Sequence, residues 1–125
     1  MIDITTATHI HHILIDKFGG SKGIRDTAAL DAALNRPYAT FDNIDLYSTP
    51  IDKAAALFES IIINHPYVDG NKRIAYVLMK LLLMESGFTI NATQDEKYEM
   101  VIAASKGEIR FDEIKLWLHS KAQNL

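Results

Sequence analysis

The sequence predicts one all-α domain, a compact bundle of about six helices around a central buried helix. The run from Ile74 to Met84 is apolar around the whole helical wheel apart from Lys80, so this helix must be buried on nearly all sides. Capping signals followed by apolar residues at helical spacing recur along the chain. A length of 125 residues with 48% hydrophobic residues suits a single core, so residues 1–125 are expected to form one domain.

The first helix is predicted to follow a cap at Thr5 or Thr6 and to stop at the Gly19-Gly20 pair. Helical spacing predicts an inward face formed by Ile10, Ile13, Leu14 and Phe18. The same helix carries three histidines, His9, His11 and His12. Because His11 points away from the other two, the pattern favours a partly exposed helix surface over a metal site.

A second, short helix is predicted over residues 27–35. Asp26 can cap its first turn, and Arg36-Pro37 closes it, because the residue before a proline disfavours helix. Residues 38–48 have no helical period, and their aromatic residues are interleaved with Asp and Asn. A loop or irregular hairpin is expected there.

The third helix is predicted to begin after Thr49, with a proline at its first position. Its broad apolar face continues to Asn64, so the helix ends directly before His65. After the central helix, Gly87 provides a stop, and residues 88–90 are expected to form a short extended connection.

Two further helices complete the prediction. Thr93 opens the first of them with a capping box. This helix stops by Gly107 and is predicted to bury Tyr98, Val101 and Ile102. The last helix starts near Phe111 and is predicted to pack through Phe111, Ile114, Trp117 and Leu118. Residues 121–125 are expected to be loose, as chain ends often are.

Residues with chemical potential gather between the third helix and the central helix, where residues 65–73 read HPYVDGNKR. Gly70 accepts backbone angles that other residues resist, which predicts a loop, and the central helix then begins near Asn71. Unpaired N–H groups at a helix start form an anion site. Lys72 and Arg73 stand at the positive end of the helix dipole, where two cations indicate a bound anion such as a phosphate.

Each of these residues also has an ordinary structural explanation. His65 can simply end the preceding helix, and Asp69-Gly70 is a common turn pair. Together, however, a base, an oxygen ligand for magnesium, a phosphate cradle and an arginine within nine residues are the groups that phosphoryl or nucleotidyl transfer requires.

The stretch HPYVDGNKR resembles the signature of the Fic/Doc family, H-[PX]-F-x-[DE]-G-N-[GK]-R, with Tyr67 in the aromatic position. With Lys72 at its eighth position, the stretch is similar to the lysine form of the signature, which is the form of the Doc (death-on-curing) branch. A second block is similar to the N-terminal part of that branch: Gly23 to Asp26, Leu30, Ala33, Leu34, Arg36 and Pro37. The resemblance covers most of the chain and implies a Fic-like helical bundle.

The resemblance implies an ATP-dependent, Mg²⁺-using transferase and assigns roles to residues of this chain. His65 would take the proton from a target Ser or Thr hydroxyl, Asp69 would hold Mg²⁺, and Arg73 would neutralise charge that develops during transfer. The nucleotide phosphates would be bound by Gly70, Asn71, Lys72 and Arg73.

Two departures from the general Fic pattern favour phosphoryl transfer over AMP transfer. Lys72 replaces the second glycine of the Fic form, and Tyr76 stands where that form has a second arginine. In Doc-type proteins the nucleotide is thought to bind reversed, so the resemblance implies a kinase that modifies a threonine of elongation factor Tu and arrests translation. An AMP transferase and a catalytically silent anion-binding module are the alternatives.

The resemblance also implies partners. The family's inhibitory segment, of the form [ST]-x-x-x-E-[GN], is not found in these residues, so a Phd-like antitoxin of a type II toxin-antitoxin system is implied. In Fic-type proteins a flap upstream of the helix before the motif docks the target backbone by strand addition. Residues 38–48 match that position in the sequence.

The composition limits the ligands and the cellular location expected for the protein. A net charge of −3 argues against a broad nucleic-acid-binding surface, so no direct DNA binding is expected. The absence of cysteine is compatible with a reducing cytoplasm, which is the expected location. The first residues lack the form of a signal peptide, and no apolar run reaches the roughly 20 residues of a membrane span.

Overall fold

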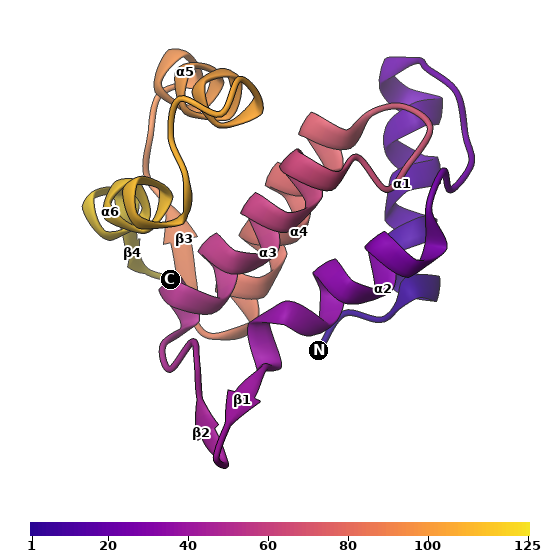
Figure 1. Cartoon of the computed structure of the whole chain (residues 1–125). Helices are drawn as coiled ribbons and strands as arrows, with labels where there is room; N and C mark the ends of the chain where they lie inside the picture. Colours follow the sequence, from indigo (N-terminus) through magenta and orange to yellow (C-terminus); the bar gives the residue numbers. More distant parts are fainter.

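The computed structural model describes residues 1–125, which form a helical bundle with four short strands (Figure 1). The six helices are α1 (Ile4–Phe18), α2 (Thr27–Asn35), α3 (Pro50–Asn64), α4 (Asn71–Glu85), α5 (Gln94–Ser105) and α6 (Phe111–Lys121). The remaining elements are a 3-10 turn η1 (Arg36–Tyr38) and the strands β1 (Thr40–Phe41), β2 (Ile44–Asp45), β3 (Phe88–Ile90) and β4 (Ala122–Asn124). The prediction of an all-α bundle of about six helices is confirmed. None of the helices is long and apolar enough to cross a bilayer.

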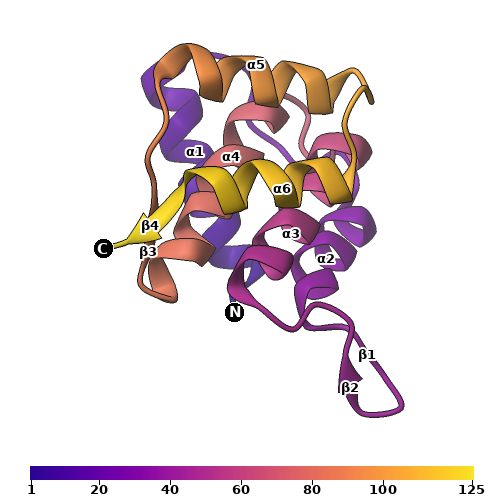
Figure 2. The same ribbon diagram turned by 90° about the vertical axis from the view of Figure 1, so that its left-hand side faces the viewer.

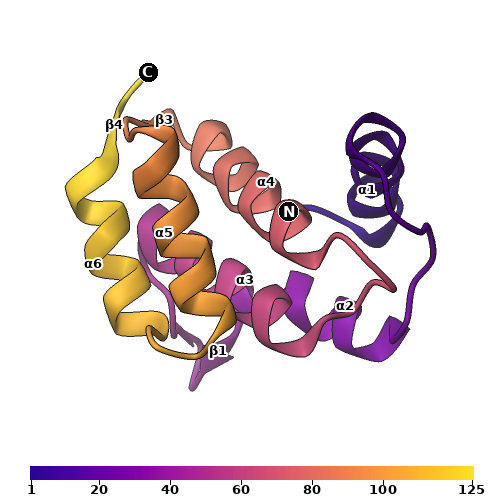
Figure 3. The same ribbon diagram turned by 90° about the horizontal axis from the view of Figure 1, so that it is seen from above.

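The centre of the bundle is the pair α3 and α4. Seen from above, α4 lies between α1 on one side and α5 with α6 on the other (Figure 3). Buried residues of α4 are Ile74, Ala75, Leu78, Met79, Leu82 and Leu83. Val77 and Leu81 are half-buried and Met84 is exposed, so α4 is buried on most but not all of its surface. The prediction of a buried central helix is therefore confirmed.

Side-chain caps start the helices largely where the sequence predicts them. Asp26, Thr49 and Thr93 each accept a hydrogen bond from the backbone N–H of the third helical residue. The cap of α1 differs, because Asp3 accepts from the backbone N–H of Thr6 at 2.8 Å. A carboxylate both pairs this N–H and suits the positive end of the helix dipole, which explains why it replaces the expected threonine.

The inward face of α1 is rotated from the predicted one. The buried residues are Ala7, His11 and Ile15, whereas Ile13 and Phe18 are 51% and 53% exposed. These three buried residues are spaced by four, so they form one stripe along the helix. Small Ala7 in this stripe lets α1 approach its neighbours closely.

The C-terminal residues are ordered, contrary to the expectation of a loose tail. Strand β4 pairs antiparallel with β3, with Phe88 opposite Asn124 and Ile90 opposite Ala122. The N–H of Leu125 also donates to the carbonyl of Gly87 at 3.0 Å. The backbone groups of β3 need hydrogen-bond partners, and the tail provides them.

Residues 38–48 contain a two-stranded hairpin that projects from the bundle (Figure 2). Its turn residues, Asp42 and Asn43, have positive φ angles of 51° and 62°, as a tight hairpin turn requires. Phe41 and Ile44 face each other across the two strands, and each is 71% exposed. The hairpin precedes α3, whereas His65 follows it, so the two lie at opposite ends of this helix (Figure 1).

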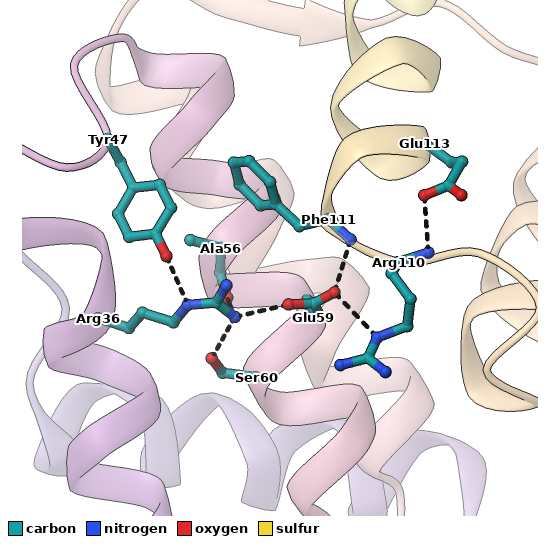
Figure 4. A network of polar contacts seen from close by, with 8 residues as sticks. All are labelled: Arg36, Tyr47, Ala56, Glu59, Ser60, Arg110, Phe111 and Glu113. Carbon is teal, nitrogen blue, oxygen red and sulfur yellow. Dashed lines mark hydrogen bonds and ion pairs between the residues drawn. The ribbon is translucent and has the colours of Figure 1, made fainter.

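A buried ion network holds the base of the hairpin and the start of α6 against α3 (Figure 4). Glu59 of α3 is 5% exposed and accepts hydrogen bonds from three groups. The donors are Nη1 of Arg36 at 2.9 Å, Nε of Arg110 at 3.2 Å and the N–H of Phe111 at 2.6 Å. Nε of Arg36 also donates to the hydroxyl of Tyr47 at 3.0 Å. The network thus couples three segments that are far apart in the sequence.

Candidate active site

The loop between α3 and α4 has two residues in the left-handed backbone region. His65 ends α3 with φ 46° and ψ 60°, and its N–H donates to the carbonyl of Ile61 at 3.1 Å. Gly70 starts α4 with φ 73°. Positive φ is uncommon for residues other than glycine, and such residues often mark functional sites. The predicted loop and helix start are therefore both present.

Backbone pairing with residues 23–26 fixes the shape of this loop. The N–H of Val68 donates to the carbonyl of Gly23 at 2.9 Å. The N–H groups of Arg25 and Asp26 donate to the carbonyl of Pro66 at 2.7 and 3.0 Å. The N-terminal block that supported the family resemblance is therefore the scaffold of the active loop.

Asn71 locks the same loop from the α4 side. Its Oδ1 accepts from the N–H of Tyr67, and its Nδ2 donates to the carbonyl of Tyr67, both at 2.9 Å. Both functional groups of the side-chain amide are therefore engaged in shaping the loop. The phosphate-binding role that the resemblance assigns to Asn71 stays a prediction.

The carboxylate of Asp69 is exposed and points along the loop. Its Oδ1 accepts from the N–H of Gly70 at 2.8 Å, and its Oδ2 accepts from the N–H of Ser21 at 3.1 Å. Each oxygen keeps a further lone pair, so the carboxylate can still ligate a cation. No group of three or more acidic or histidine residues could form an all-protein metal cage. The donor set suits Mg²⁺, which commonly uses one carboxylate, substrate phosphates and water.

A residue of α1, His11, supports the loop from behind. Its Nε2 lies 2.7 Å from the carbonyl oxygen of Asp69. Its ring stacks on Tyr67, with centroids 4.0 Å apart and planes 8° apart. Because a carbonyl oxygen only accepts, Nε2 carries the hydrogen. Burial raises the pKa of Tyr67, and a hydrogen bond with Thr8 at 3.1 Å partly opposes the rise.

The expectation of a partly exposed histidine surface is wrong for His11, which is 1% exposed, whereas His9 is exposed. Its spacing of four from Ala7 and from Ile15 is the sequence signal that places it on the buried stripe. Gly20, expected only as a helix stop, is also constrained by the site. A Cβ there would lie 2.7 Å from Oδ2 of Asp69, so the close approach requires glycine.

A cleft of about 520 Å³ lies between the start of α4 and α5. All six predicted site residues line it: His65, Asp69, Gly70, Asn71, Lys72 and Arg73. Tyr76 and Val77 of α4 also line it, and α5 contributes Gln94, Lys97, Tyr98, Val101 and Ile102. The structure thus brings every predicted site residue to one cleft, whose lining includes both polar and apolar residues. No residue of the hairpin lines it, so the hairpin does not occupy the flap position that the resemblance implies.

The predicted packing of α5 is wrong for Tyr98 and partly correct for Val101, which packs against the core. Tyr98 is 67% exposed, and Val101 and Ile102 are half-buried, whereas Met100 and Ala104 face the core. This helix has apolar residues on two faces, and periodicity alone does not decide which face meets the core. The predicted face lines the cleft, and within it Val101 also contacts the core.

The cleft is locally positive although the whole chain carries a net charge of −3. Lys72, Arg73 and Lys97 line it, and none of them forms an ion pair with an acidic side chain. Asp69 is its only acidic residue. The guanidinium of Arg73 lies 4.2 Å from the ring centroid of Phe18, which holds it by a cation–π contact. An anionic ligand would satisfy these unpaired cations.

The fold and the cleft define a helical domain that can hold an anion beside a histidine. A family model described as the Fic/DOC family matches residues 1–83. The chain belongs to this family, which confirms the resemblance of residues 65–73.

Curated relatives include both branches of the family. Toxin Doc of Mycolicibacterium smegmatis is 45% identical over 78 residues, which cover 62% of this chain and 60% of that protein. Protein adenylyltransferase fic-1 of Caenorhabditis elegans is 34% identical over 73 residues, 55% of this chain and 14% of that protein. Protein adenylyltransferase Fic of Nematostella vectensis is 40% identical over 65 residues, 49% of this chain and 15% of that protein. The chain spans less than two thirds of the length of each relative. The 45% identity to Toxin Doc supports the Doc branch.

Proposed function

We propose that this chain transfers the γ-phosphoryl group of ATP to a serine or threonine hydroxyl of a protein. One observation carries the proposal: His65, Asp69 and three unpaired cations line one cleft at the start of a helix. A base, a magnesium ligand and cations around the phosphates are the groups that phosphoryl transfer needs. The relative named Toxin Doc adds support for this branch of the family.

His65 would act as the general base. Its side chain is exposed at the mouth of the cleft, and its backbone is held by Arg25, whose Nε donates to the His65 carbonyl at 2.6 Å. In the proposed reaction the hydroxyl oxygen of the target attacks the γ-phosphorus, and an imidazole nitrogen takes its proton. The bond between the γ-phosphorus and the bridging oxygen breaks, and ADP leaves with the electron pair.

The remaining residues would bind and neutralise the phosphates. Asp69 would hold Mg²⁺, which neutralises phosphate charge when bound. Lys72, Arg73 and the unpaired N–H groups of the first turn of α4 would stabilise the charge that spreads over the phosphate oxygens. Gly70 lets the loop pack closely on α1, since its φ is 73° and a Cβ there would lie 3.1 Å from Cδ1 of Ile15.

Tyr76 favours phosphoryl transfer over AMP transfer. Its phenol supplies no cation in either protonation state, and burial raises its pKa to about 12, so it also adds no negative charge near neutral pH. Lys72 adds bulk and charge beside it, one helical turn nearer to the loop. A reversed nucleotide with its γ-phosphate near His65 is therefore the proposed orientation.

The proposed target and partner follow from the same branch of the family. We infer that the target is a threonine of elongation factor Tu, so that modification arrests translation, and that a Phd-like antitoxin restrains the chain. The relative named Toxin Doc supports the coarser inference that the chain is a toxin with an antitoxin partner. Co-expression tests the partner. A Phd-like protein should relieve the growth arrest, and the same protein without its toxin-binding segment should not.

Labelled ATP tests the reaction itself. The protein is incubated with purified elongation factor Tu and ATP labelled at either the α- or the γ-phosphate. Label from the γ-phosphate alone is expected, and it should be lost in His65→Ala but kept in His119→Ala, which removes an exposed histidine outside the cleft. Label from the α-phosphate would replace this proposal with AMP transfer. The same reaction is repeated with a bacterial lysate as the source of target proteins. A chain that binds nucleotide but transfers no label to elongation factor Tu or to any lysate protein would favour a silent anion-binding module.

A further inference from the structure

We propose that Lys97 of α5 is a third phosphate-binding cation, which makes the cleft specific for a nucleoside di- or triphosphate. The proposal rests on the proposed function, because it takes a nucleotide as the ligand of the cleft. Lys97 lies outside the motif of residues 65–73 and on a different helix, 24 positions beyond Arg73 in the sequence.

The geometry places Lys97 across the cleft from the motif. Its Nζ lies 6.0 Å from the ring centroid of Tyr76, and both side chains line the cleft. The neighbouring Glu96 does not line the cleft and instead pairs with Lys121 of α6. Lys97 therefore has no acidic partner on α5. Its ammonium group is directed toward the space between α4 and α5.

The charges within the cleft need an anion that reaches across it. Lys72, Arg73 and Lys97 face a single carboxylate, that of Asp69, so like charges meet in a partly enclosed space. Such an arrangement is unfavourable unless a ligand offsets the repulsion. Because Lys72 and Arg73 come from α4 and Lys97 comes from α5, the offsetting charge must contact two helices at once.

The spacing along α4 indicates how far this charge extends. Lys72 lies at the first turn of α4, and Tyr76, beside Lys97, is four residues later. This is about 6 Å along the helix axis at the usual rise per residue. A single phosphate contacts one end of this span, whereas a chain of two or three phosphates contacts both. Val101 and Ile102 of α5 also line the cleft and offer an apolar surface for the base.

The test compares binding of a ligand series to matched variants. Adenosine, AMP, ADP and ATP, each with Mg²⁺, are titrated by calorimetry into the wild type and into Lys97→Gln, Lys97→Arg and Lys106→Gln. Lys106 is an exposed lysine that follows α5 and does not line the cleft, so it controls for net charge. Thermal melts establish that each variant is folded.

Lys97→Gln should weaken ATP and ADP binding by about tenfold, the loss expected for one hydrogen bond to a charged group. Adenosine binding should be unchanged, Lys97→Arg should bind like the wild type, and Lys106→Gln should have no effect. An equal loss for adenosine and ATP would indicate a packing role and overturn the proposal. Unchanged ATP binding in Lys97→Gln would overturn it while leaving the proposed function intact. A wild type that binds no nucleotide would overturn both.

Discussion

The ring of His11 lies flat on the ring of Tyr67, with centroids 4.0 Å apart, while its Nε2 contacts the carbonyl oxygen of Asp69 at 2.7 Å. One buried side chain of α1 thereby contacts the loop at two points. The backbone N–H of Ser21, just beyond α1, adds a third contact through Oδ2 of Asp69. The first helix is therefore a support for the loop that presents the candidate catalytic residues.

Two substitutions at His11 separate its hydrogen bond from its packing. His11→Phe keeps a ring against Tyr67 but leaves the carbonyl of Asp69 without its donor, so the free energy of unfolding should fall by about 1–3 kcal/mol. His11→Gln places an amide N–H near the position of Nε2 and should recover part of the loss. Urea unfolding measures stability, and amide exchange at Gly70 reports the loop. Equal exchange in the two variants would mean that the hydrogen bond does not position the loop.

Replacing His65 should remove catalysis without unfolding the protein. His65→Asn is the sharper variant, because asparagine tolerates the left-handed backbone that this residue adopts. The transfer rate should fall by about 10²–10⁴, the usual contribution of a general base. The melting temperature should change little, because the side chain is exposed. A variant that transfers at the wild-type rate would exclude His65 as the base.

Leu82→Ala tests the central helix. Leu82 is 4% exposed within the main core, so truncation should destabilise the protein by about 2–5 kcal/mol. Leu81→Ala, at a half-buried neighbouring position, is the matched control and should cost less. Denaturant midpoints measure both, and a loss below about 0.5 kcal/mol at Leu82 would contradict its burial.

The network around Glu59 should be costly to break from one side. Arg36→Met removes one partner of the buried Glu59 carboxylate. Burial alone would lower the pKa of Arg36, but its hydrogen bonds to Tyr47 and Glu59 outweigh this effect and raise the pKa. A loss of about 3 kcal/mol is expected, at the low end for buried pairs, because Arg36 is 28% exposed and Arg110 still contacts Glu59. Adding Glu59→Leu should restore part of the stability. No recovery in the double variant would mean that packing, not charge, dominates there.

The pH dependence of stability should report Glu96. Hydrogen bonds from Lys121 and from the backbone of Thr93 lower its pKa from 4.5 to about 2. Because the folded state lowers this pKa, the contribution to stability is present above about pH 4.5 and is lost as the pH falls toward 2. The free energy of unfolding of the wild type should therefore fall more steeply over this window than that of Glu96→Gln. Parallel pH profiles would show that the ion pair with Lys121 contributes nothing.

Local signals in the sequence were enough to predict the helices and the active loop. The caps at Asp26, Thr49 and Thr93 act within one turn, so neighbouring residues alone decide them. The turn at Gly70 and the start of α4 are local in the same way, whereas pairing with residues 23–26 fixes the shape of the whole loop. The all-round apolar pattern of α4 likewise leaves few alternatives to burial.

Contacts between distant segments decided the rest. Periodicity did not reveal which apolar stripe of α1 or α5 faces the core, because each helix offers two, and only packing against α4 selects one. The tail forms strand β4 because it supplies hydrogen-bond partners to the backbone of β3, which lies 32 to 36 positions earlier in the sequence.

The sequence by itself determined an all-α fold with a histidine, a carboxylate and two cations at the start of its central helix, because these features depend on residues close together in the chain. Only the tertiary structure decided that His11 supports the loop, that the hairpin lies away from the cleft, and that Lys97 faces the motif from α5. These relationships depend on how whole helices pack, and the free energy of that packing is spread over many residues of the core.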